Sequence, residues 1–168
     1  MFSIVSLEDN IKIKPSEFGL QNIHDKIIIN TFEGKVLGRI NSYIIKIIDV
    51  DHESIKDGLV NDIDGSINYL IKYSAVIFEP MKDHILDVIV KECNDNTIWS
   101  KVALLKNVSI IECICPKKYI DTSFTFNEET LTWSNSNTVI KIGSELKLKI
   151  VNYQIDSNKI MIIGSIVI

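Results

Sequence analysis

The stretch YSAVIFEPMKDHILDVIV, from Tyr73 to Val90, decides how the rest of the chain is divided. Its first half alternates as a strand that is apolar on both faces, and its second half places Leu86, Val88 and Val90 on one face of another strand. Pro80 lies between the two halves. Because proline removes a hydrogen-bond donor from the ladder, it fits a strand end or a junction better than a central strand. We therefore interpret Pro80 as a joint between two separate β units.

The sequence before Pro80 predicts one helix packed against a small antiparallel sheet. Residues 2–13 alternate as a strand, and Pro15 then opens a predicted helix, because proline is tolerated in the first turn of a helix. Gly34 is the predicted C-cap of this helix. The strongest strand pattern that follows covers residues 43–50.

A hairpin signal lies in the second part of this unit. Asp64 and Gly65 separate two apolar runs, and Asp-Gly at such a place indicates a tight turn between antiparallel strands. The second of these runs continues as a long strand to Phe78. The fold class predicted for the first unit is therefore α+β.

The sequence after Pro80 carries turn signals and strand patterns but no helix pattern. A polar excursion over residues 124–137 indicates a small additional hairpin. Five short strands separated by turns are typical of a closed Greek-key barrel of the OB type. The predicted barrel strands cover residues 84–93, 97–105, 107–115, 145–153 and 158–167.

The bulk composition narrows the function classes. The chain has 168 residues, 46% of them apolar and 24% charged, which is typical of a soluble globular protein. No apolar run reaches about 18 residues, so we expect no membrane span, and the N-terminus shows no signal peptide. The net charge of −4 disfavours a free-standing nucleic-acid binder, which needs a basic face, and predicts modest RNA affinity at most.

The residues that could carry chemistry form no recognisable set. The three cysteines are odd in number and include no CxxC pair, which indicates reduced thiols in an intracellular compartment, with Cys113 and Cys115 as small buried side chains. His24, His52 and His84 lie in different predicted elements without a nucleophile partner. No calcium loop and no phosphate-binding glycine loop is present. We therefore expect a protein that is not an enzyme and binds neither a cofactor nor a metal.

One pattern on the predicted barrel indicates binding. Trp99 lies in the second barrel strand with Lys101 two residues later, and Lys117, Lys118 and Tyr119 cluster in a later loop. On an OB surface an exposed aromatic ring can stack on a base while a nearby cation meets phosphate. The alternative is that Trp99 belongs to the core or to a protein interface and that the lysines only keep the surface soluble.

Several short motifs, in matching order over nearly the whole chain, resemble the larger stalk subunit of cellular RNA polymerases, most closely the seventh subunit of RNA polymerase II. The motifs are MFSIVSLEDNIKIKPSEFG (1–19), FEGKVLG (32–38), the spacing of Gly58 and Gly65, KYSAVIFEP (72–80), DVIV (87–90), GSELKLKIV (143–151) and IIGSIVI (162–168).

This resemblance implies a tip domain over residues 1–80 and an OB barrel over residues 81–168. It implies a non-catalytic nuclear subunit that pairs with a small helical subunit of the fourth-subunit type and supports transcription initiation. The tip domain would dock on the polymerase core near the clamp and the RNA exit channel, and the barrel would contact nascent RNA. By position, Gly58, Asp64 and Gly65 fall in the docking tip loops, and Trp99 falls at an aromatic position on the RNA-facing strand.

Alternatives remain within and outside this family. The stalk subunits of RNA polymerase III, of archaeal polymerases and of large DNA viruses share the same architecture. A free-standing OB-fold RNA-binding protein is the alternative from another class, and it would need a basic barrel face and salt-sensitive RNA binding by the chain alone. A small enzyme is disfavoured because no acid–base or nucleophile set exists.

Overall fold

The computed structural model describes residues 1–20, 22–55, 58–105, 110–156 and 159–167. The chain divides into two compact units, Met1–Glu79 and Pro80–Ile168, so the division falls at Pro80. The first unit combines a helix with an antiparallel sheet, and the second contains a closed five-stranded barrel. The predicted α+β fold class is confirmed.

The first unit is built on an antiparallel sheet with the strand order β1-β5-β3-β2. The long central pairing joins β1 (Phe2–Ile13) to β5 (Ile67–Phe78) without a break in register. On its other side β5 pairs with β3 (Ser42–Asp51), which carries two bulges, and β3 pairs in turn with β2 (Val36–Leu37). The short β4 (Leu59–Val60) also pairs with β5, which confirms the predicted hairpin.

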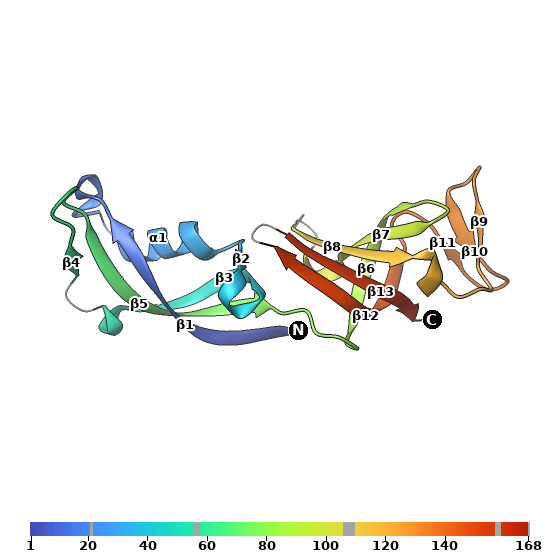
Figure 1. Ribbon diagram of the computed structural model, residues 1–168, viewed down its shortest axis with the longest axis horizontal. Helices are drawn as coiled ribbons and strands as arrows, with labels where there is room; N and C mark the ends of the chain where they lie inside the picture. Colours follow the sequence, from blue (N-terminus) through green and yellow to red (C-terminus); the bar gives the residue numbers. More distant parts are fainter. Residues whose placement is uncertain (21, 56–57, 106–109, 157–158, 168) are drawn as a thin grey trace. The chain divides into compact units, whose positions relative to one another are not determined.

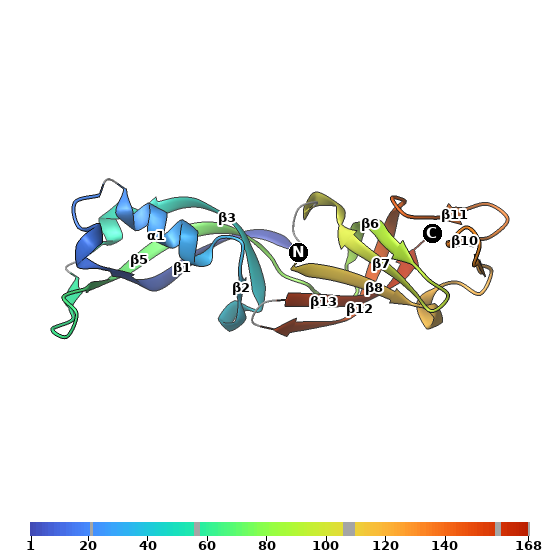
Figure 2. The ribbon, with the colours of Figure 1, turned by 90° about the horizontal axis from the view of Figure 1, so that it is seen from above.

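A single α-helix among the described residues, α1 (Ile23–Phe32), lies over one face of this sheet (Figures 1 and 2). Ile28 of the helix is completely buried, and the ring of Phe32 stacks on Tyr73 of β5 at a centroid distance of 5.6 Å. Strand alternation supplies the other half of this core, because every second side chain points toward the helix. The buried cluster consists of Ile11, Ile13, Ile28, Ile44, Ile47, Val50, Ile71, Tyr73, Ala75 and Ile77.

The helix begins eight residues later than predicted. Pro15–Glu17 forms only a single 3₁₀ turn (η1), and α1 begins at Ile23. The prediction was wrong because Gly19, at φ +82°, and Asn22, at φ 54°, both adopt left-handed conformations that interrupt a helix. The end of the helix was predicted correctly, since Gly34 lies just beyond the last turn at φ +77°.

A polar contact connects the two edges of the sheet, strand β1 and the turn that follows β2. Arg39, in a 3₁₀ turn after β2 (η2, Gly38–Ile40), donates to the backbone oxygen of Glu8 at 3.0 Å and forms an ion pair with Asp9. The hydroxyl of Tyr73 donates to the same Asp9 carboxylate at 2.7 Å. Burial and this carboxylate together raise the pKa of Tyr73 well above its ordinary value. The tyrosine therefore serves as a neutral donor that orients Asp9 toward Arg39.

The second unit contains a closed barrel with the strand order β12-β13-β8-β7-β6 (Figure 1). Its strands are β6 (Ile85–Cys93), β7 (Thr97–Val102), β8 (Ile111–Pro116), β12 (Glu145–Asp156) and β13 (Lys159–Val167). All neighbours pair antiparallel except β13 and β8, which are parallel. Closure leaves no open edge on the sheet.

The predicted barrel strands agree with the observed ones apart from their ends. Residues 103–105 were assigned to a strand but form a 3₁₀ turn (η4, Ala103–Leu105) after β7. Residues 107–109 and 158, also assigned to strands, lie outside the described residues. On β6 the predicted alternation is confirmed, because Leu86, Val88 and Val90 are all buried.

The polar segment between β8 and β12 forms a small sheet of its own, β11-β10-β9. The predicted hairpin is confirmed as β9 (Thr125–Asn127) and β10 (Thr132–Ser134), and β11 (Val139–Ile140) adds a third strand that the sequence did not predict. Trp133 of β10 is 2% exposed, and its indole nitrogen donates to the backbone oxygen of Asn94 in the β6–β7 turn at 2.9 Å. This tryptophan attaches the small sheet to the barrel.

The barrel interior makes stability sensitive to alkaline pH. Burial raises the pKa of the Cys113 thiol to about 12 and that of Cys115 to about 11, from an ordinary value of 9.0. Above pH 9 the unfolded chain loses these protons while the folded barrel keeps them. The free energy of unfolding should therefore fall by about 1 kcal/mol per thiol for each pH unit between 9 and 11.

Urea unfolding followed by circular dichroism at pH 8, 9.5 and 10.5 measures this loss. A double variant, Cys113→Ala with Cys115→Ala, serves as the control, because it keeps the tyrosines and lysines that also titrate at high pH. We expect a clearly shallower pH dependence in the variant than in the wild type. Identical slopes would show that the buried thiols are not linked to folding.

Candidate functional site

The turn between β4 and β5 is a rigid structure that presents apolar side chains. The backbone N–H of Ile63 donates to the Asn61 side chain at 3.0 Å, and the Gly65 N–H donates to the Asn61 backbone oxygen at 2.8 Å. The backbone and hydroxyl of Ser66 donate to Asp64 Oδ1 at 3.1 and 2.6 Å. Such side-chain-to-backbone bonds fix a turn without needing a packed core.

Asp64 also ties this turn to the neighbouring strand. Its carboxylate forms an ion pair with Lys12 of β1 at 2.5 Å. Hydrogen bonds from Lys12 and then from Ser66 hold the pKa of Asp64 well below its ordinary range. The predicted docking residue Asp64 thus orders the turn from within.

The two predicted docking glycines have structural roles in the same hairpin. Gly65 adopts φ +67°, a conformation that favours glycine. Gly58 lies directly against β5, where an added Cβ would come within 2.2 Å of Ile67 and 2.8 Å of Tyr69. The structure therefore brings Gly58, Asp64 and Gly65 together in one hairpin, where all three shape the backbone.

The sequence did not predict the exposed apolar surface that this hairpin presents. Ile63 at the tip of the turn is 95% exposed, and Leu59 and Val60 of β4 are 76% and 63% exposed. We call Leu59, Val60 and Ile63 the tip hairpin surface. An exposed apolar group held by a rigid turn is typical of a protein-docking site. The sequence carries no signal for this exposure, because it follows from the hydrogen bonds that Asn61 and Asp64 make within the turn.

Trp99 and Lys101 lie on the outer face of the barrel. Along β7 the side chains of Ile98, Ser100 and Val102 are buried, so those of Trp99 and Lys101 point outward. Trp99 is half-buried and pairs across the sheet with Glu92 of β6 and Ile114 of β8. The tryptophan is therefore a surface residue with an acidic and an aliphatic neighbour, outside the barrel core.

The loop after β8 places two lysines on aromatic rings. Residues Lys117–Tyr119 form a 3₁₀ turn (η5) in which both lysines are exposed. The Lys117 ammonium lies 5.9 Å from the ring centroid of Trp133, and the Lys118 ammonium lies 4.7 Å from that of Tyr119. These distances fit cation–π contacts. Lys117 thus contacts Trp133, a residue that the sequence did not indicate as part of this cluster.

The charge on the barrel is balanced. Ten of the 18 basic and ten of the 22 acidic residues belong to the second unit, so the net charge of −4 comes from the first. Ion pairs join Lys149 to Asp83 at 2.9 Å and Lys159 to Glu112 at 2.8 Å. The exposed lysines of η5 take part in neither of these ion pairs.

The described histidines and other side chains that could act as catalysts or metal ligands do not form a catalytic or metal-binding site. His24 meets the ring of Tyr69 edge-on, and His52 lies 3.2 Å from Asp25, the residue that follows His24. Within residues 1–20, 22–55, 58–105, 110–156 and 159–167, no three metal-binding side chains come together. No helix in the same ranges is long and apolar enough to cross a membrane.

Fold and surfaces together define a class of protein: a two-unit chain with an apolar tip hairpin on an α+β unit and a closed barrel of the OB type. The chain is 30% identical over 168 residues to the RNA polymerase II subunit RPB7 of Saccharomyces cerevisiae, covering 99% of this chain and 95% of the yeast protein. It is 27% identical to RPB7 of Glycine max, covering 99% and 92%. The chain belongs to the RPB7 family of RNA polymerase stalk subunits.

Similarity extends to a related subunit of another polymerase. RNA polymerase III subunit rpc8 of Dictyostelium discoideum is 23% identical over 154 residues, covering 89% of this chain and 58% of the rpc8 protein. No family model matches the chain.

Proposed function

We propose that this chain is a non-catalytic stalk subunit of RNA polymerase II that docks on the polymerase core through the tip hairpin surface. The observation that carries this proposal is the similarity to RPB7 proteins over 99% of the chain, which includes both units. Identity is 26–30% to the polymerase II subunits and 23% to the polymerase III subunit, which favours polymerase II. A polymerase II subunit works in the nucleus, which is the location we propose.

The docking role rests on the exposure of the tip hairpin surface. Ile63 is 95% exposed on a turn that is already ordered, so the backbone that carries it loses little conformational freedom on binding. Apolar groups of this kind contribute most when a partner encloses them completely. The hairpin thus fits the proposed contact near the clamp and the RNA exit channel, through which the subunit supports initiation.

The pairing role rests on the face of the first sheet that α1 does not cover. Ile4, Ile48 and Leu70 are 69%, 52% and 49% exposed. An amphipathic helix of a small partner subunit could bury such side chains, as helices do against sheets. Co-expression with the fourth-subunit type of partner should therefore raise the yield of soluble chain. If the chain gave the same yield and stability alone, this part of the proposal would be wrong.

The RNA-contact role rests on Trp99 and the two η5 lysines. An outward aromatic side chain and exposed cations are the groups that single-stranded RNA binders use for bases and phosphates. The balanced charge of the barrel and Glu92 beside Trp99 keep the expected affinity modest. These charges also argue against a free-standing RNA-binding protein, the alternative from another class.

Replacing Trp99 with alanine should weaken binding of single-stranded RNA by the assembled stalk about 10-fold, within the ~1–3 kcal/mol that one stacked base contributes. Fluorescence anisotropy with a labelled RNA at fixed salt measures this change. Trp99→Phe, which keeps an aromatic face, should bind within about threefold of the wild type. If Trp99→Ala bound RNA as well as the wild type, Trp99 would have no part in RNA contact.

The docking proposal is tested with polymerase core from which the stalk has been removed. The purified chain, together with its small partner, should bind this core and restore a complex that survives gel filtration. An isolated chain that stays monomeric and does not associate with the core would contradict the proposed function.

A further inference from the structure

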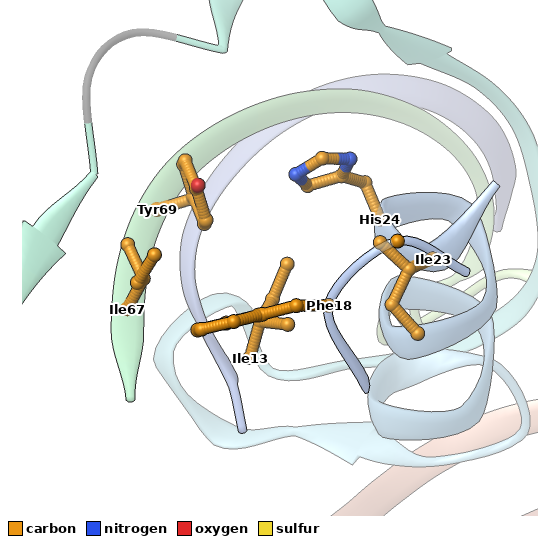
Figure 3. A pocket seen from close by; sticks show the side chains of 7 residues that line it. Ile13, Phe18, Ile23, His24, Ile67 and Tyr69 are labelled. Atoms are coloured by element: carbon orange, nitrogen blue, oxygen red, sulfur yellow. The ribbon is translucent and has the colours of Figure 1, made fainter. Parts of the chain in front are cut away.

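The first unit contains an apolar pocket beside the tip hairpin (Figure 3). Its volume is about 220 Å³. The walls come from the end of β1, the segment before α1, the first turn of α1 and the start of β5. The lining residues are Ile13, Phe18, Gly19, Ile23, His24, Ile67 and Tyr69.

The pocket suits an uncharged ligand group. His24 and Tyr69 meet edge-on at a centroid distance of 5.1 Å and form one wall (Figure 3). Burial and then the neighbouring His52 lower the pKa of His24, against a smaller opposite effect of Asp25. The imidazole is therefore neutral at neutral pH. The other walls are apolar side chains and one glycine.

The pocket lies next to the tip hairpin, because two of its lining residues contact the hairpin segment that carries Gly58 and Val60. Ile67 pairs with Val60 in the β4–β5 ladder, and both Ile67 and Tyr69 contact the Gly58 backbone position. On the opposite wall, Phe18 is 48% exposed although it lines a cavity. A partner that covered the tip hairpin surface would therefore lie beside the pocket.

An acidic segment lies near the helix wall of the pocket. Residues 49–64 contain six acids and one lysine, and the first unit carries the whole net negative charge. This segment reaches the helix wall of the pocket through the contact of His52 with Asp25 at 3.2 Å. A partner segment with lysine or arginine beside an apolar side chain would match both the charge and the cavity.

We propose that this pocket receives one uncharged aromatic or large aliphatic side chain from a basic segment of the polymerase core, an inference that rests on the proposed docking function. A dry cavity of ~150 Å³ holds benzene, so a pocket of this size accommodates a ring. The tip hairpin surface then forms the outer part of the contact, and the buried side chain supplies its anchor.

The test fills the pocket from within. Ile23→Trp places an indole in the cavity from the first turn of α1, while Ile29→Trp, on the same helix at a position that is 41% exposed and outside the pocket, is the matched control. Binding of each purified full-length variant to stalk-free polymerase core is measured by biolayer interferometry. We expect Ile23→Trp to weaken binding at least 10-fold and Ile29→Trp to leave it within about twofold.

The outcomes separate the pocket from the docking function. If the wild type binds the core and Ile23→Trp binds equally well, the pocket proposal is overturned and the docking proposal stands. If the wild type does not bind the core, both are overturned.

A second pair of variants covers the case in which Ile23→Trp fails to fold by circular dichroism. Phe18→Ala removes one wall of the pocket, whereas Phe18→Leu keeps an apolar wall there. Phe18→Ala should bind at least fivefold more weakly than Phe18→Leu. Equal binding by these two variants would overturn the pocket proposal.

Discussion

Replacing Ile63 with aspartate should weaken binding of the chain to stalk-free polymerase core at least 100-fold, which corresponds to about 2.7 kcal/mol. Ile63 is 95% exposed, so its side chain contributes little to the fold, and we expect the free energy of unfolding to change by less than about 0.5 kcal/mol. In the docked state the same position would be enclosed. A carboxylate there would lose its water without gaining a partner, and it would face the acids of the same unit.

Two measurements on the same protein separate docking from stability. Binding to the core is measured by biolayer interferometry, and stability by urea unfolding. Ile142→Asp, at a site in the barrel unit that is 60% exposed, is the matched control and should leave binding to the core unchanged. If Ile63→Asp bound the core with wild-type affinity, the tip hairpin surface would have no part in docking.

Replacing Gly164 with alanine should destabilise the barrel by about 3 kcal/mol. Gly164 lies on β13 opposite Ile150 of β12, beside the only register shift in that pairing within the described residues. An added Cβ would lie 2.4 Å from the side chain of Leu148 and 2.7 Å from the backbone oxygen of Lys149. Leu148 is 1% exposed and has no room to move, so the strands would have to separate.

Thermal and urea unfolding of the Gly164→Ala variant measure this effect. Ser165→Ala, at the next position of the same strand, is the control and should change stability by less than about 1 kcal/mol. A Gly164→Ala protein as stable as the wild type would show that β12 and β13 are more loosely packed than described.

The sequence was sufficient for the architecture because the strands alternate strongly and Pro80 separates the last strand of the first unit from the first strand of the barrel. The same alternation grouped Leu86, Val88 and Val90 on one face of β6, and all three are buried, but it left open whether Trp99 belongs to the core or to the surface. It could not place the start of α1, since the left-handed conformations of Gly19 and Asn22 depend on how the segment packs. The short strand β11 was missed because two residues carry no detectable period.

The candidate site was only partly predictable, for a different reason. Gly58, Asp64 and Gly65 stand out in the sequence because glycine and aspartate mark a turn, and the structure shows that they build the hairpin. Ile63 does not stand out, because an isoleucine between polar residues reads as an ordinary apolar residue until its exposure is known. Contacts across long sequence distances, such as that of Arg39 with Asp9 or Trp133 with Asn94, depend on the tertiary fold and leave no local pattern.

The identification of this chain as a polymerase subunit is tested most directly by purifying a tagged chain from its own cells and identifying its stable partners by mass spectrometry. We predict the large catalytic subunits of RNA polymerase II and one small helical subunit, in amounts matching the chain itself, with the Ile63→Asp variant keeping the small subunit and losing the large ones. Recovery of the chain alone, or with ribosomal or RNA-decay proteins in place of polymerase, would contradict the account.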